Sequence, residues 1–224
     1  MEAFYYILAL IVLLFIVYRL VKWSKYKSLE PLLPHKYNFG KRRDTFRYVL
    51  DWLEKHDGRV LVETGVARMG LLHSKSDGAS TIVFGTWAKQ QGADKAVRLH
   101  SVDINQQNVD TCQETVSVEG LDDYITLNVS DSVAYLQAFE PTIDLLYLDS
   151  YDYDKRDPEV NKASQEHHLN EVKAAESNLH DKSVILIDDC NLPGGGKGRL
   201  VIDYLLERGW QVVMSKYQVV LTRA

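Results

Sequence analysis

Residues 59–65 read RVLVETG, an apolar run that ends on an acid, a threonine and a glycine. A short run rich in valine and leucine is typical of a strand that is buried on both faces of a parallel sheet. Segments with strand-like and helix-like patterns alternate from residue 44 onward. This alternation predicts an α/β fold, with a mostly parallel sheet and helices on both of its faces.

The expected elements follow from periodicity and from start and stop signals. Asp44 and Thr45 can cap a first helix with an apolar face. The predicted strands cover residues 59–63, 97–102, 124–127, 143–148 and 183–187. The predicted helices cover residues 79–91, 105–118, 132–139, 162–179 and 200–208. Residues 210–214 and 218–222 are also strand-like, and the three residues between them permit an antiparallel hairpin but no crossover helix.

Acidic residues end four of the predicted strands. They are Glu63, Asp103, Asp149, and the pair Asp188 and Asp189. A single acid after a strand is commonly a helix cap. Because the carboxyl ends of parallel strands meet at one edge of a sheet, where ligands bind in open α/β folds, we expect these acids to converge on one site.

The parallel sheet with a final antiparallel hairpin resembles the layout of class I S-adenosylmethionine-dependent methyltransferases, and residues 62–65 (VETG) resemble their first motif. In that motif the glycine lets the backbone approach the cofactor, and the acid helps to hold the methionine part. The resemblance implies that Glu63, Thr64 and Gly65 bind the cofactor. A Rossmann-like methyltransferase fold is therefore expected over about residues 45–224.

The segment DGAST, residues 77–81, resembles the turn that presents helix N–H groups to the cofactor carboxylate. It adds Gly78, Ser80 and Thr81 to the implied cofactor site. The chain departs from the family pattern just before it, because residues 66–75 replace a compact glycine loop. This insertion is either a substrate lid or a longer loop.

Three further segments extend the resemblance. Residues 99–103 (LHSVD) resemble the second motif, which implies that Asp103 accepts hydrogen bonds from the ribose hydroxyls. Residues 130–132 (SDS) resemble the segment that flanks the adenine, which implies roles for Ser130, Asp131 and Ser132; a simple helix cap is the alternative. Residues 143–149 resemble the fourth motif, whose acid, here Asp149, lies near the reacting methyl group.

A metal site is also implied by the resemblance to O-methyltransferases whose fourth and fifth strands end in acids. In the metal-dependent members these acids hold Mg²⁺, and they correspond to Asp149, Asp188 and Asp189 here, with Asn191 as an alternative ligand. Carboxylate oxygens suit this hard cation, which would lower the pKa of an acceptor hydroxyl. The catechol-type members carry a lysine three residues after the first of these acids. Asp152 stands there in this chain, so a lysine base is not implied.

Two more features fall near the expected site. His167 and His168, predicted to open the helix at 162–179, are candidate general bases, with an ordinary capping or surface role as the alternative. Residues 193–198 (PGGGKG) lack the spacing of a phosphate-binding loop and the Ser or Thr that follows its lysine. We interpret them as a flexible loop over the site, from which Lys197 can touch an anionic substrate.

The N-terminal segment predicts a membrane anchor. Residues 3–18 carry no charge, and the apolar character continues to Val21; a bilayer core needs about 20 helical residues. A cleaved signal peptide would carry a positive start and a small-residue cleavage site, and an interfacial helix would show a polar face. The predicted division is an anchor at 1–23, a linker or loosely docked arm at 24–41 and a methyltransferase domain at 42–224.

Flanking charge predicts the orientation of this anchor. Arg19, Lys22, Lys25 and Lys27 follow the apolar segment, and only Glu2 precedes it. The positive-inside rule therefore places the N-terminus outside and the catalytic domain in the cytoplasm.

Composition excludes several classes of protein. The net charge of −5 argues against nucleic acid as a partner. The two cysteines, Cys112 and Cys190, offer no disulfide framework or zinc spacing. We expect an enzyme that methylates oxygen on a small or lipid-like, membrane-associated acceptor. The rivals are a nicotinamide oxidoreductase, disfavoured because no G-x-G-x-x-G follows the first strand, and a non-catalytic membrane adaptor on the same fold.

Overall fold

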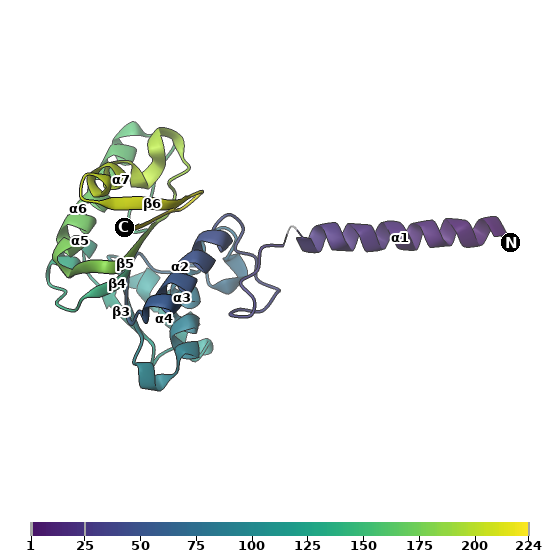
Figure 1. The fold of residues 1–224 in the computed structure, drawn as a ribbon, viewed down its shortest axis with the longest axis horizontal. Coiled ribbons are helices and arrows are strands. Elements are labelled where there is room, and N and C mark those ends of the chain that lie inside the picture. The colour runs from purple at the N-terminus through teal and green to yellow at the C-terminus, as the bar shows by residue number, and fades with distance from the viewer. Residues whose placement is uncertain (1, 25, 224) are drawn as a thin grey trace.

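The computed structural model describes residues 2–24 and 26–223 and contains one seven-stranded sheet (Figure 1). The strand order is β3-β2-β1-β4-β5-β7-β6. The parallel strands are β1 (Val60–Thr64), β2 (Arg98–Asp103), β3 (Ile125–Val129), β4 (Ile143–Leu148) and β5 (Leu179–Ile187). The final hairpin, β6 (Trp210–Ser215) and β7 (Val219–Arg223), pairs antiparallel to β5 through β7. The predicted fold class is confirmed.

Helices cover both faces of this sheet (Figure 1). On one face lie α2 (Arg43–His56), α3 (Ser80–Gln91) and α4 (Gln106–Val118), and on the other α5 (Ser132–Gln137), α6 (Pro158–Ala175) and α7 (Arg199–Leu206). Successive strand residues point to opposite faces. Leu61 accordingly packs in the first core and Val62 in the second. Burial on both faces explains why the strands read as apolar runs.

Short 3-10 turns also occur between the strands and the α-helices. They are η1 (Leu71–His73), η2 (Ala93–Lys95), η3 (Glu176–Asn178) and η4 (Pro193–Gly198). Of these, η4 follows β5 and borders the site described below.

The long helix and the strand after it begin earlier than predicted. Helix α6 starts at Pro158 because the Asp157 side chain accepts hydrogen bonds from the backbone N–H groups of Glu159 (3.0 Å) and Val160 (3.3 Å). Strand β5 starts at Leu179, whose register partner is Ile143. The predicted cap of α2 was also wrong: the N-cap is Arg42, which makes no side-chain cap, and Thr45 donates to the Arg42 carbonyl.

The segment before α2 is packed rather than loose. Leu29, Leu33, Tyr37 and Phe39 are all buried in the same core as α2 and α3. The Phe39 and Phe46 rings meet edge to face, with centroids 6.3 Å apart. Residues 29–41 are therefore part of the domain, which corrects the linker predicted at 24–41; aromatic and leucine side chains without a clear period concealed this packing.

Helix α1 (Glu2–Ser24) extends away from the domain (Figure 1). Its window Phe4–Val21 has a mean hydropathy of 2.5 and is not buried against any described part of the chain. The helix is long and apolar enough to cross a membrane, and a signal sequence near an N-terminus has the same properties. Lys25, one of the residues behind the predicted orientation, lies outside the described residues.

Candidate active site

Two adjoining cavities lie at the carboxyl ends of the parallel strands. The larger has a volume of about 400 Å³ and the smaller about 220 Å³. Four residues line both: Gly65, Asp103, Ile104 and Ser150. The hydroxyl oxygen of Ser150 is buried and has no hydrogen-bond partner within the described part of the chain. A buried polar atom of this kind at a cavity wall favours a bound ligand.

Gly65 brings the two cavities together because the β1 and β4 ends approach closely there. Its φ is +85°, and a Cβ at this position would lie 2.6 Å from the carbonyl oxygen of Asp149. Only glycine fits both the conformation and the space. The backbone at Gly65 therefore lines the cavities directly, as the resemblance implied.

Glu63 lies behind the cavities and lines neither of them. Its carboxylate accepts hydrogen bonds from the hydroxyls of Ser80, Thr81 (2.7 Å) and Ser101 (2.6 Å). Burial raises the pKa of Glu63 to about 7, although these three hydrogen bonds oppose the shift. Glu63 joins the start of α3 to β1 and β2, so we assign it a positioning role and not the direct cofactor contact that was predicted.

The other predicted residues of this region divide between the cavity wall and the layer behind it. Ser80 lines the larger cavity. Thr64 and Thr81 are fully buried, and Thr81 also accepts a hydrogen bond from the Ala67 N–H (2.8 Å). Gly78 adopts φ +88° against the Arg42 side chain. These residues shape the turn, and Ser80 alone of them faces the larger cavity.

Asp103 ends β2 and faces both cavities. Its Oδ1 accepts hydrogen bonds from the Asn105 N–H (2.8 Å) and from Asn108 Nδ2 (3.3 Å), which hold the carboxylate in place. The remaining acceptor capacity of the carboxylate is available to a ligand with hydroxyl donors.

The smaller cavity has a mainly apolar wall with a polar end. Asp131, Ser132 and His167 lie there, whereas Ser130 lines neither cavity. Asp131 caps α5 by accepting from the Ala134 N–H (2.9 Å). The Ser132 hydroxyl lies 2.9 Å from His167 Nε2 and donates to Glu171 Oε1 (2.5 Å). The hydrogen bond that His167 donates to the Glu171 carboxylate raises the pKa of His167.

His167 and His168 are in the middle of α6 and not at its start. His168 is fully buried, lies 2.6 Å through Nδ1 from the Ser164 carbonyl oxygen, and lines neither cavity. Burial lowers the pKa of His168 to about 4, so the ring is neutral. His168 is no longer a candidate base, and His167 faces the smaller cavity only.

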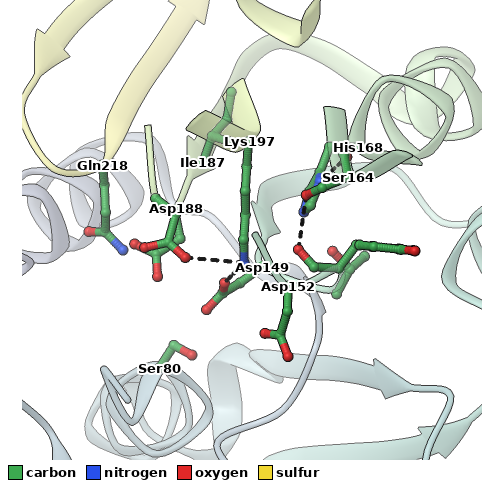
Figure 2. A network of polar contacts seen from close by, with 12 residues as sticks. Ser80, Asp149, Asp152, Ser164, His168, Ile187, Asp188, Lys197 and Gln218 are labelled. Carbon is green, nitrogen blue, oxygen red and sulfur yellow. Dashed lines mark hydrogen bonds and ion pairs between the residues drawn. The ribbon is translucent and has the colours of Figure 1, made fainter. Parts of the chain in front are cut away.

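Three carboxylates converge beside the larger cavity, as predicted. Ligand oxygens of Asp149, Asp188 and Asp189 all lie within 4.8 Å of one another. Figure 2 shows the Lys197 side chain reaching down to Asp149, with Asp188 beside it. Lys197 Nζ lies 2.5 Å from Asp149 Oδ1 and 3.5 Å from Asp189 Oδ2.

Arg42 supplies a second cation to this cluster. Its guanidinium donates to Asp188 from Nε (3.1 Å to Oδ1) and from Nη2 (2.7 Å to Oδ2), and it also donates to the Ser76 carbonyl (3.1 Å). Tyr217 donates to Asp189. Arg42, Tyr217 and Lys197 all line the larger cavity, whose polar wall faces the acid cluster.

Sequence reasoning missed Arg42 and undervalued Lys197. Residues 193–198 are not a flexible loop, because Gly196, Lys197 and Gly198 are buried. Arg42 precedes all of the segments that resemble methyltransferase motifs. The signal that would have found both is the excess of converging acids, which need buried cations as partners.

The β1–α3 insertion and the segment after β4 meet over the larger cavity. Arg68 and Asp152 line it and form an ion pair, with Nη1 3.4 Å from Oδ2. Val66, Ala67 and Leu71 are buried, whereas Leu72 is exposed. Buried residues therefore anchor part of the insertion to the domain, and Asp152 lines the larger cavity.

Comparisons with known proteins agree with this geometry. A family model described as a methyltransferase domain matches residues 75–190. No curated protein sequence matches the chain significantly.

Solved structures share the fold at low sequence identity. A methyltransferase from Geobacter sulfurreducens is 17% identical, with a TM-score of 0.53 over 80% of this chain and 77% of that one. A putative caffeoyl-CoA O-methyltransferase from Staphylococcus aureus is 8% identical, with a TM-score of 0.57 over 80% and 81%. An O-methyltransferase from Bacillus cereus, solved with S-adenosylhomocysteine, is 10% identical, with a TM-score of 0.53 over 80% and 81%.

Proposed function

The chain belongs to the methyltransferase-domain family and is an S-adenosylmethionine-dependent methyltransferase, and we propose that it methylates a hydroxyl oxygen of a small or membrane-associated acceptor bound in the larger cavity. The observation that carries this proposal is the pair of adjoining cavities, which share Gly65, Asp103 and Ser150. The smaller cavity suits the nucleoside, and the larger cavity opens onto the acid cluster.

The residues of the cofactor site fit S-adenosylmethionine by the chemistry of their donors and acceptors. The Asp103 carboxylate suits the two ribose hydroxyls. The apolar wall of the smaller cavity, which includes Val102 and Ile104, suits the adenine ring, with Asp131 and Ser132 at its polar end. The absence of a Cβ at Gly65 permits close approach of the methionine part. When bound, the cofactor supplies a methyl group activated by its sulfonium charge.

Asp149 is the residue best placed to handle the acceptor. It lines the larger cavity, and Lys197 and Tyr147 (OH to Oδ2, 3.2 Å) donate hydrogen bonds to it. A hydroxyl that donates a hydrogen bond to Asp149 is held with its oxygen toward the shared wall of the two cavities. As the oxygen–methyl bond forms and the sulfur–methyl bond breaks, the hydroxyl proton passes to this carboxylate. Positioning supplies much of the rate of such a transfer.

Mg²⁺ is not included in this proposal. The three acids could hold a cation by their mutual distances, but each already has a cationic partner in Arg42 or Lys197. The carboxylates that would bind Mg²⁺ are therefore already paired with cationic side chains.

The N-terminal helix supports a membrane tether. We assign Phe4–Val21 as a single span, with the N-terminus outside and the catalytic domain in the cytoplasm, from its hydropathy and from the basic residues that follow it. A tether close to the domain favours a lipid-like acceptor, because the packed segment at residues 29–41 (the packed arm) keeps the site near the membrane surface. Carbonate extraction and protease protection test this assignment. Release by carbonate, or an N-terminus removed in the mature chain, would contradict it.

The methyl-transfer proposal is tested by incubating the full chain with methyl-labelled S-adenosylmethionine and fractionated membrane extracts. We expect label in a base-stable, hydroxyl-derived methyl ether and loss of labelling in Asp149→Asn. Label on nitrogen, or equal labelling by the variant, would contradict the assigned chemistry.

A further inference from the structure

The acid cluster does not fit a divalent metal ion as it stands. Its oxygens lie close enough together to surround one. However, Lys197 Nζ lies 2.5 Å from Asp149 Oδ1 and 3.5 Å from Asp189 Oδ2. Both oxygens of Asp188 accept from Arg42. The positions that a metal would need between these oxygens are therefore taken by nitrogen donors of the chain.

The Lys197 ammonium is held there in its charged form. The side chain is 1% exposed. Burial alone lowers the pKa of Lys197, but the carboxylates of Asp149 and Asp189 reverse the effect and raise it above its ordinary value. A buried ammonium is tolerated only with such partners, so the acids and the lysine require each other.

The backbone of η4 is shaped to place this lysine. Gly194, Gly195 and Gly196 have φ values of 72°, 88° and 55°, which glycine adopts without strain. A Cβ at Gly196 would lie 1.8 Å from the Asp189 carbonyl oxygen. Gln165 of α6 also donates to the Gly196 carbonyl (2.9 Å). The run of glycines therefore presses the chain against Asp189 and directs Lys197 into the cluster.

The charge balance supports the same conclusion. Three carboxylates face two buried cations, so a divalent ion added among the same oxygens would lie beside the buried ammonium of Lys197. Like charges at such separations repel strongly at low dielectric constant. Without Lys197, the oxygens of Asp149 and Asp189 that it pairs with would be left as an open acidic site of the kind that binds hard cations.

We propose that Lys197 is the resident cation of this cluster and takes the place of a divalent metal ion. Its ammonium, at the wall of the larger cavity, stabilises negative charge that develops on the acceptor oxygen. This last role rests on the proposed methyl transfer, whereas the exclusion of metal does not.

The test is a titration of the full chain, in detergent, with Mn²⁺. The electron paramagnetic resonance signal of the free ion measures how much Mn²⁺ is bound. The variants are Lys197→Met, Lys197→Arg as the matched control that keeps a cation, Asp149→Asn, and the double variant Lys197→Met with Asp149→Asn. Circular dichroism and S-adenosylhomocysteine calorimetry on the same samples report folding and cofactor binding separately.

We expect Lys197→Met to bind Mn²⁺ at least about ten-fold more tightly than the wild type. The gain should vanish in the double variant and be absent in Lys197→Arg. A folded Lys197→Met chain with no gain would overturn the proposal. Mn²⁺ binding by the wild type that is weakened in Asp149→Asn would also overturn it. This comparison decides the question even if Lys197→Met fails to fold. Failure of wild-type cofactor binding would instead refute the methyltransferase function and leave the metal result intact.

Discussion

Arg42 and Asp188 form a bidentate ion pair across 146 positions of the chain, with Nη2 2.7 Å from Oδ2 and Nε 3.1 Å from Oδ1. Their side chains are 7% and 0% exposed. Arg42 directly precedes α2 and follows the packed arm, and Asp188 directly follows β5. The pair therefore ties the segment between helix α1 and α2 to the acid cluster of the site.

Removal of Arg42 should destabilise the fold. Arg42→Ala leaves the buried carboxylate of Asp188 without its main partner, which typically costs about 3–5 kcal/mol of unfolding free energy. Arg43→Ala is the matched control: its pair with Asp44 is about one-third exposed, and such pairs contribute about 0–1 kcal/mol. Denaturant unfolding of both variants measures the difference. Equal losses would show that the buried pair is not special.

Glu63 makes stability depend on pH. Its pKa rises from an ordinary 4.5 to about 7 on folding. Between these values the folded chain keeps a proton that the unfolded chain has lost, so this group's contribution to stability decreases as pH rises. At about 1.4 kcal/mol per pH unit, the decrease reaches about 3 kcal/mol at most.

Glu63→Gln isolates this contribution because the amide accepts hydrogen bonds but does not titrate. We expect the unfolding midpoint of the variant to fall less with pH than that of the wild type between about pH 4.5 and about pH 7. Parallel slopes for the two chains would mean that Glu63 is ionised throughout and that its three hydroxyl donors outweigh burial.

Gly65→Ala tests the close approach of β1 to β4. The new methyl group would lie 2.6 Å from the Asp149 carbonyl oxygen at φ +85°, so we expect a loss of stability well above about 1 kcal/mol and weaker cofactor binding. Gly209→Ala is the control, since its φ is +80° and nothing lies within 4 Å of the new atom. Thermal unfolding compares them. Similar losses would assign the effect to backbone conformation alone.

A chain that begins at residue 40 should unfold more readily than one that begins at residue 26. The shorter chain loses Leu29, Leu33 and Phe39, and each buried side chain of this kind contributes about 2–5 kcal/mol. Differential scanning calorimetry measures the change. Equal melting temperatures would restore the interpretation of this segment as a linker.

The fold could be predicted because its signals are local. Apolar strands, helix periodicity and the three-residue link before the last strand each act over a few residues, and β4 has the predicted bounds. The starts of α6 and β5 were missed because capping by Asp157 and pairing of Leu179 overrode the apolar period. The packed arm was missed for a related reason: its buried residues follow no period.

The site was predictable where strand ends determine it. Asp103, Asp149, Asp188 and Asp189 converge because parallel strands share one edge. The partners of these acids could not be deduced in the same way. Arg42 and Lys197 reach the cluster from segments whose paths depend on tertiary packing, and the burial of Glu63 and His168 depends on neighbouring helices.

Binding of S-adenosylhomocysteine to the full chain, measured by titration calorimetry, tests the central claim most directly. Asp103→Ala should weaken binding by at least about ten- to a hundred-fold, since even one hydrogen bond to a charged group contributes about 1.5–3 kcal/mol. Asp110→Ala, on the exposed face of α4, should bind like the wild type. Saturable wild-type binding with this pattern is the predicted result. A folded wild-type chain that binds no S-adenosylhomocysteine would contradict the account.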